Sequence, residues 1–264
     1  MIPCVVAFPS SLIGAFFVIM NINHTSEKTL IERLFDVGAH FGFTKSRRHP
    51  TTSSFIFGNK QGTDIIDLEK TVESLASAQA VLTEAGKAGK TVLFVGTKEE
   101  ITGIVRAHAE QVTMPYVVNR WVGGMLTNFS EVKKRIARLA ELTQQGESGE
   151  LERKYTKKER VVIGREFDKL MHNFAGIKNM ERLPQLLVIV DPRHDEIAVS
   201  EARALNIPVI GLASSDTNIE LITYPVVAND ALQSSVTFIL DELTSAYAKG
   251  VSEFTPVKRE EVRR

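Results

Sequence analysis

The 264-residue chain balances 32 Lys and Arg against 32 Asp and Glu and is 43% hydrophobic, which excludes a disordered or fibrous protein. Its single cysteine, Cys4, excludes a disulfide framework and a cysteine-based zinc site. The charge is polarised, because residues 120–182 hold 14 Lys/Arg against 9 acids and residues 186–248 hold 2 against 9. Residues 37–63 add four cations and no acid, so a polyanion would bind to the early and middle segments.

The first 26 residues predict an extension outside the folded domains. A run of 19 residues without charge, Ile2 to Met20, has the length of a marginal membrane span, but it contains two prolines and a glycine. No cation precedes Lys28, so the positive segment of a signal peptide is missing. Translation that starts at Met20 is the favoured alternative, and a membrane anchor is the less favoured one.

Residues 27–119 predict the first part of an α/β domain. Apolar residues recur at helical spacing before and after a segment rich in Gly, Ser and Thr, and continuous apolar runs follow. The predicted elements are a helix over 27–37, a loop-like segment over 38–62, a helix over 67–87, a strand over 91–95, a helix from Lys98 to about Gln111, and a strand over 115–118. This strand–helix–strand order predicts a parallel sheet.

Residues 120–182 differ from the segments on both sides. Two charged amphipathic helices, over 128–145 and 156–173, are separated by a Gln/Gly/Glu/Ser turn, which predicts an inserted, projecting α-helical hairpin. The α/β pattern then returns over residues 183–248, with strands over 186–190, 208–212 and 226–227 and helices over 194–205 and 229–248. Residues 249–264 predict a charged, flexible tail.

The segment before the first hairpin helix is the strongest candidate for binding RNA. It places Arg120 beside Trp121, the only tryptophan, and a glycine pair leads into a helix with Lys133, Lys134 and Arg135. Aromatic rings stack on bases and cations bind phosphates, whereas the segment has no nucleophile, general base or ligand cluster for catalysis. Trp121 either stacks on a base or pins the hairpin to the α/β domain, and pinning is the commoner role of a lone tryptophan.

A second basic group follows the glycine- and phenylalanine-rich residues 38–43. Its members are Lys45, Arg47, Arg48 and His49. We expect these side chains to contact RNA phosphates, and at least one phenylalanine, Phe41 or Phe43, to pack in the core. The alternative is a basic surface loop without an RNA contact.

Two further motifs follow predicted strands. Thr97 and Lys98 lie where a strand leads into a helix, but the spacing of a Walker loop is absent, so a tight turn capped by Thr97 is favoured over a nucleotide site. Lys98 remains a candidate ligand for an RNA phosphate. Asp191 to Asp195 follow another strand, and a role in ordering the turn is favoured over catalysis. The six histidines are scattered, so we expect neither a metal nor a cofactor.

Several motifs together resemble the bacterial small ribosomal subunit protein two family from about Leu30 to Ala248. They are Gly38–Gly42, Phe55–Gly58, Ile65–Thr71, Leu93–Lys98, Arg120–Asn128 and Gly176–Met180. The sequence departs from the family at Phe43, where a second histidine is usual, which weakens any metal role there. It also departs at Ile219 to Leu221, where an Asp-Pro pair is usual.

The resemblance implies a Rossmann-like parallel sheet flanked by helices, with the hairpin as an insertion. It implies a structural, non-enzymatic protein of the cytoplasmic ribosome, without a membrane role, that binds small-subunit ribosomal RNA and neighbouring small-subunit proteins. In many bacteria the family also supports docking of the large mRNA-binding ribosomal protein one. Two rival functions stay open: a nucleotide-dependent α/β protein that uses Thr97, Lys98 and Asp191, and a membrane-tethered adaptor that uses residues 2–19.

Overall fold

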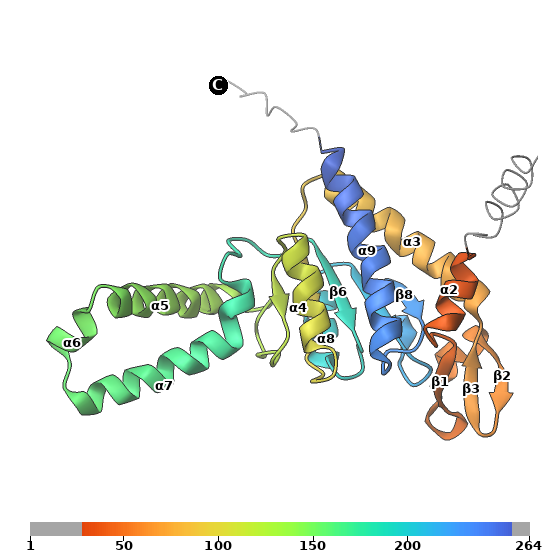
Figure 1. The fold of residues 1–264 in the computed structure, drawn as a ribbon, viewed down its shortest axis with the longest axis horizontal. Coiled ribbons are helices and arrows are strands. Elements are labelled where there is room, and N and C mark those ends of the chain that lie inside the picture. Colours follow the sequence, from red (N-terminus) through yellow and green to blue (C-terminus); the bar gives the residue numbers. More distant parts are fainter. Residues whose placement is uncertain (1–27, 255–264) are drawn as a thin grey trace, which may run out of the picture.

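A parallel sheet of five strands, in the order β5-β4-β6-β7-β8, lies at the centre of the computed structural model, which describes residues 28–254 (Figure 1). The strands are β4 (Val92–Val95), β5 (Tyr116–Val117), β6 (Leu186–Val190), β7 (Val209–Ala213) and β8 (Tyr224–Val227). Every residue of β4, β6 and β7 is buried, because both faces of the sheet are covered, as expected for parallel strands built from continuous apolar runs.

Helices on both faces of the sheet form two apolar cores. The helices are α2 (Leu30–Asp36), α3 (Leu68–Lys87), α4 (Thr102–Gln111), α8 (Glu196–Ala204) and α9 (Gln233–Ser252). Side chains alternate along β4, so Phe94 packs with residues of α3, α4 and α9, whereas Leu93 and Val95 pack with residues of α8 and the hairpin. The predicted α/β class, with a Rossmann-like parallel sheet flanked by helices, is confirmed.

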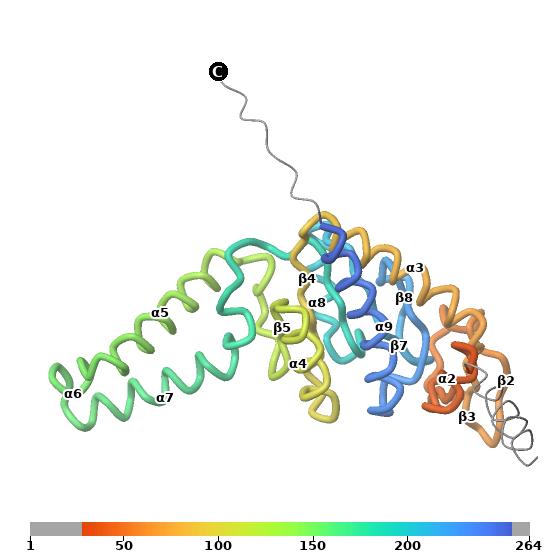
Figure 2. Tube along the Cα trace, turned by 45° about the horizontal axis from the view of Figure 1, so that its top comes forward, coloured from red at the N-terminus to blue at the C-terminus, as the bar shows by residue number. Residues whose placement is uncertain are grey.

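The inserted hairpin extends away from the β5 edge of the sheet (Figures 1 and 2). It consists of α5 (Phe129–Glu147), a short α6 (Glu150–Lys154) at the tip, and α7 (Lys157–Phe174), which a 3-10 turn, η3 (Ala175–Ile177), follows. Val132, Leu139 and Leu142 of α5 and Leu170 of α7 are buried along the hairpin. A capping box between Thr156 and Glu159 begins α7. The sequence predicted the two long helices but not α6.

The loop-like prediction for residues 38–62 was wrong, because this segment belongs to a second sheet. The strands β1 (Phe41–Thr44), β2 (Ile56–Lys60) and β3 (Thr63–Ile66) pair antiparallel in the order β1-β3-β2. Two 3-10 turns, η1 (Lys45–Arg47) and η2 (Pro50–Phe55), separate β1 from β2. They interrupt the alternation of apolar and polar residues by which strands are predicted. Gln61 and Gly62, both with positive φ, connect β2 to β3.

Several boundaries differ from the prediction. Helix α2 is capped by Thr29, and the whole 1–26 extension with its alternative start lies outside the described residues. Helix α9 continues to Ser252, so residues 249–252 are helical. Within residues 28–254 no helix combines the length and the apolar character needed to span a bilayer.

Candidate nucleic-acid interface

A buried glutamate holds the root of the hairpin against the α/β domain. Glu201 lies on α8, and its Oε1 accepts hydrogen bonds from the indole N–H of Trp121 at 3.1 Å and from the backbone N–H of Gly124 at 2.8 Å. Its Oε2 accepts from the backbone N–H of Leu126 at 2.9 Å and from the N–H and hydroxyl of Thr127. One carboxylate therefore accepts the hydrogen bonds of the donors in the turn that leads into α5.

The charge of Glu201 is stabilised by these donors. Burial alone raises the pKa of this carboxyl, but the hydrogen bonds from Thr127, Leu126, Trp121 and Gly124 outweigh burial, so the pKa lies below its ordinary value. The Trp121 side chain is only 6% exposed. This geometry favours the pinning role of Trp121, because a buried indole has no face free for a base.

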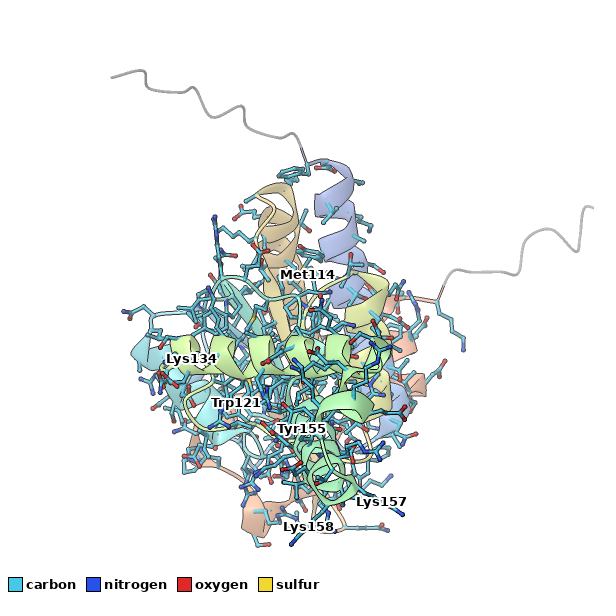
Figure 3. All side chains as sticks on the ribbon, turned by 90° about the vertical axis from the view of Figure 1, so that its left-hand side faces the viewer. Met114, Trp121, Lys134, Tyr155, Lys157 and Lys158 are labelled. Atoms are coloured by element: carbon cyan, nitrogen blue, oxygen red, sulfur yellow. The ribbon has the colours of Figure 1, made fainter. Side chains whose placement is uncertain are left out.

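The hairpin carries the predicted cations on its surface. Arg120, Lys133, Lys134 and Arg135 are exposed, and within residues 28–254 only Lys134 of these four forms an ion pair, with Glu131 at 2.7 Å. Both side chains of that pair are exposed, so water screens the attraction between the two charges. The Lys133 ammonium lies 5.3 Å from the centre of the Phe129 ring. Figure 3, viewed from the side of the hairpin, shows Lys134 on one helix and Lys157 and Lys158 extending from the other.

Within the described residues, some cations of the predicted basic loop pair with carboxylates, and others do not. Lys45 is exposed. The Arg47 guanidinium lies over the Phe43 ring at 4.5 Å and pairs with Asp216 at 3.3 Å. Phe43 is half-buried and Phe41 is 48% exposed, so neither is fully in the core.

Arg48 and His49 serve the structure of the loop itself. The Arg48 Nε donates to Oδ2 of Asp64 at 2.7 Å, and a second guanidinium nitrogen donates to the other oxygen. The Asp64 side chain is fully buried, and the hydrogen bond from Arg48 is the main cause that lowers its pKa. His49 caps η2 through its ring nitrogen. These contacts leave Lys45 and Arg47 as the more accessible cations of the loop.

We predict that Arg48→Ala destabilises the fold by about 3 kcal/mol, because it leaves the buried Asp64 carboxylate without its cation. Arg47→Ala is the matched control: Asp216 keeps its ion pair with Arg193, and the loss is within about 1 kcal/mol. Urea unfolding of the full chain measures both. Equal stabilities of the two variants would contradict the assignment of Arg48 to the fold.

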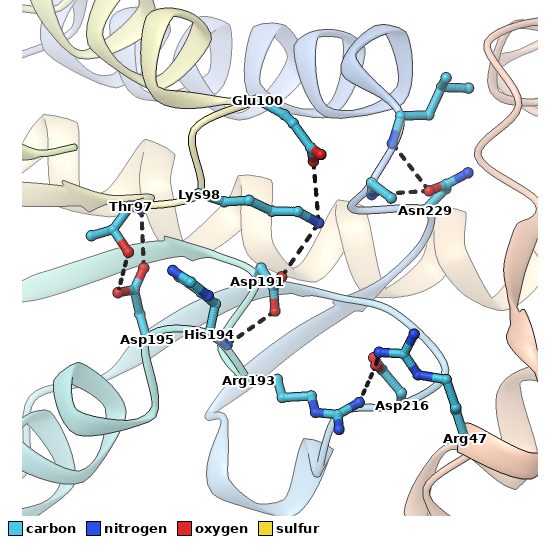
Figure 4. A network of polar contacts seen from close by, with 12 residues as sticks. Arg47, Thr97, Lys98, Glu100, Asp191, Arg193, His194, Asp195, Asp216 and Asn229 are labelled. Atoms are coloured by element: carbon cyan, nitrogen blue, oxygen red, sulfur yellow. Dashed lines mark hydrogen bonds and ion pairs between the residues drawn. The ribbon is translucent and has the colours of Figure 1, made fainter. Parts of the chain in front are cut away.

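The carboxyl edge of the parallel sheet holds a network of paired groups (Figure 4). The backbone N–H and the hydroxyl of Thr97 donate to Asp195 at 3.1 and 2.8 Å, so Thr97 does not cap α4, which begins at Thr102. Lys98 lies 3.6 Å from both Asp191 and Glu100. Asp191 orders the turn after β6 by accepting from the backbone N–H of His194.

Asp230 lies buried near this network, with neither carboxyl oxygen hydrogen-bonded. Burial, and after it the negative charge of Asp191, raises the pKa of Asp230 to about 8, against a smaller opposing effect of Lys98. The edge where a nucleotide phosphate would bind in this kind of fold therefore holds the acidic residues Asp191, Asp195 and Asp230 around Lys98. The nucleotide-dependent rival, which needs Thr97 and Lys98 free, gains no support from this arrangement.

We predict that the raised pKa of Asp230 makes the fold less stable as the pH rises. Between its ordinary pKa of 3.8 and about 8, the folded chain keeps a proton that the unfolded chain has lost. The free energy of unfolding falls across that window by about 1.4 kcal/mol per pH unit, and Asp230→Asn removes the fall. Thermal unfolding from pH 5 to pH 9 measures it, with the exposed Asp168→Asn as control. Parallel curves for wild type and Asp230→Asn would contradict the burial argument.

The cations that α7 contributes near the hairpin root were not among the residues predicted from the sequence. Arg165 and Lys169 are exposed, form no ion pair within the described residues, and line a cleft together with Arg135 of α5. Their spacing of four places them on one face of α7, which was the only available signal. Within residues 28–254 no group of His, Cys, Asp and Glu side chains is arranged to hold a metal ion.

A Rossmann-like domain with a cationic helical arm and an acidic sheet edge defines a polyanion-binding protein and gives no sign of a nucleotide-dependent enzyme. The family model described as "Ribosomal protein S2" matches residues 34–250. The chain therefore belongs to the ribosomal protein S2 family.

Curated relatives named small ribosomal subunit protein uS2 agree with this assignment. The small ribosomal subunit protein uS2 of Nocardia farcinica is 42% identical over 221 residues, which cover 84% of this chain and 77% of that protein. The uS2 of Salinibacter ruber is 39% identical over 237 residues, which cover 90% and 73%. The uS2 of Sulfurimonas denitrificans is 40% identical over 217 residues, which cover 82% and 83%.

Proposed function

We propose that this protein is a structural, non-enzymatic constituent of the small subunit of the cytoplasmic ribosome, where it binds ribosomal RNA and neighbouring small-subunit proteins and supports assembly and translation. The observation that carries the proposal is the family match over residues 34–250, on a fold whose projecting hairpin presents unpaired cations. The relatives at about 40% identity bear the name of a small-subunit protein.

The binding mechanism is neutralisation of RNA phosphates by exposed cations. Those with the most accessible charge among the predicted residues are Lys45, Arg47, Arg120, Lys133, Lys134 and Arg135. Each phosphate contact releases a counterion, so affinity falls with salt by roughly 0.7 to 0.9 log units per contact for each log unit of salt. Lys98 contributes less, because two carboxylates already neutralise it.

We also propose that different segments bind the RNA and support the binding segment. Residues 120–182 form the RNA-facing arm, and residues 27–119 and 183–248 form the body that holds it. Glu201 supports this division, since it joins the arm to the body through residues 121–127.

Charge reversal on the arm tests the RNA contact. We predict that Lys133→Glu with Arg135→Glu lowers the salt slope of binding to small subunits by about 1 to 2 and leaves the unfolding transition unchanged. Lys90→Glu with Lys249→Glu is the matched control, because both residues are exposed and lie outside the two hairpin helices, Lys90 after the end of α3 and Lys249 in the last turn of α9. A slope unchanged by the first pair, or changed equally by both pairs, would contradict an RNA-facing arm.

We further propose that the protein supports docking of the large mRNA-binding ribosomal protein one. This rests on the family resemblance alone. Small subunits depleted of the present chain and then resupplied with it should regain protein one, and subunits that retain protein one without the chain would refute the proposal.

A further inference from the structure

A cleft of about 710 Å³ opens between the two hairpin helices where they leave the α/β domain. We name it the root cleft, and its walls are α5, α7 and the turn at residues 122–124. Its floor is apolar: Val132, Leu170 and Phe174 are buried there, each about 6% exposed. Its volume lies within the range of pockets that hold small organic groups, roughly 300 to 1,000 Å³.

The rim of the root cleft carries more cations than acids. Arg135, Arg165 and Lys169 line it, and within residues 28–254 none of the three forms an ion pair. The two acids of the lining have partners outside it: Glu131 pairs with Lys134 at 2.7 Å, and Glu166 lies 3.5 Å from Arg138, which also pairs with Glu141. The cleft therefore presents three cations around an apolar floor.

The floor and the rim select the same occupant. An apolar floor accepts a flat ring, and cations on two helices accept anionic groups on either side of that ring. We propose that the root cleft binds one unstacked nucleotide of single-stranded RNA, with its base on the apolar floor and its flanking phosphates on Arg135, Arg165 and Lys169.

Two other features of the cleft agree with a nucleotide. The amides of Asn128 and Asn173 lie in the lining and provide the donors and acceptors that base edges use. A Cβ placed on Gly123 would meet no atom within 4 Å, so the turn leaves the cleft mouth open. An acidic peptide with a large apolar residue is the competing occupant.

This inference rests on the proposed function, and the test separates the two. Small subunits carrying the full chain are irradiated with ultraviolet light, digested, and searched for nucleotide–peptide cross-links. Co-sedimentation of the chain reports the proposed function. A cross-link to residues 170–178, the tryptic peptide that holds Leu170, Asn173 and Phe174, reports the root cleft.

Gly123→Leu is the decisive variant, because it fills the mouth of the cleft at a position without positive φ or close neighbours. We expect it to abolish the cross-link and to weaken retention on subunits roughly tenfold. Gly146→Leu, at an exposed and equally open position in α5 away from the root cleft, is the matched control and keeps both. Arg165→Glu with Lys169→Glu should lower the salt slope by about 1 to 2.

Four results would overturn the inference. A chain that co-sediments without a cross-link on residues 170–178, or with one that Gly123→Leu preserves, refutes the root cleft and leaves the proposed function standing. Recovery of a peptide of another protein cross-linked in the cleft replaces the nucleotide by the acidic peptide. A wild-type chain that does not co-sediment refutes the proposed function, and the inference fails with it.

Discussion

Glu201→Ala is expected to destabilise the protein by about 4 kcal/mol or more, since each buried donor left without an acceptor costs about 1 to 3 kcal/mol. The substitution removes the acceptor of two buried donors, the indole N–H of Trp121 and the backbone N–H of Leu126, and of two part-buried ones, the backbone N–H groups of Gly124 and Thr127. These residues form the turn that starts α5, so the loss also loosens the attachment of the hairpin.

The only tryptophan of the chain makes this result directly visible. Trp121 is 6% exposed, and its emission should shift to longer wavelength when the root opens. Urea unfolding gives the free energy. Glu196→Ala, an exposed glutamate in the first turn of the same helix, is the matched control and should stay within about 1 kcal/mol of wild type. A Glu201→Ala chain with wild-type stability and emission would refute the role of Glu201.

The same carboxylate makes the stability of the fold depend on pH in the acidic range. Because the folded pKa of Glu201 is lowered, its contribution is present above the ordinary pKa of 4.5 and is lost as the pH falls through the folded value. Wild type should therefore lose stability below about pH 4.5 more steeply than Glu201→Gln, whose side chain does not titrate.

Gly250→Ala is expected to cost about 3 kcal/mol or more, at the upper end of overpacking effects, because rigid backbone must move. Helices α3 and α9 meet at glycines: a Cβ on Gly250 would lie 2.2 Å from the carbonyl oxygen of Thr83, and one on Gly86 would lie 2.5 Å from that of Tyr247. Neither contact can be relieved by a side-chain rotation.

The same substitution in α7 should have the opposite sign. A Cβ on Gly164 meets nothing within 4 Å, so Gly164→Ala should gain about 0.5 to 1 kcal/mol from helix propensity. Thermal unfolding of both variants measures the contrast. Equal effects of the two alanines would show that α3 and α9 do not pack through their glycines.

The sequence predicted the elements whose signal is local. Strand β6 is a continuous apolar run bounded by polar residues, and its predicted limits, 186–190, match the structure. The helical hairpin has a charged amphipathic pattern that neither strands nor loops share. The small antiparallel sheet was missed, because β1 and β3 are four residues long and two 3-10 turns interrupt the pattern.

The candidate site was predicted less completely, because its contacts join residues far apart in the chain. Glu201 sits in an ordinary amphipathic helix, and only the fold brings it to Trp121, 80 residues earlier. Arg48 and Arg47 are neighbours with the same chemistry, yet Arg48 pairs with a buried carboxylate, Asp64, that has no second ion pair within the described residues, whereas Arg47 shares the buried Asp216 with Arg193. A run of cations therefore predicts a basic surface, but the fold decides which cations remain free.

Sedimentation of native lysate through sucrose gradients at moderate and high salt tests the central claim most directly, with the chain located by mass spectrometry. The account predicts that the chain co-sediments with the small ribosomal subunit at moderate salt and is progressively released as the salt rises, because exposed cations such as Lys133 and Arg135 hold RNA phosphates. A chain that runs free of the small subunit at moderate salt, or with membranes, would contradict it.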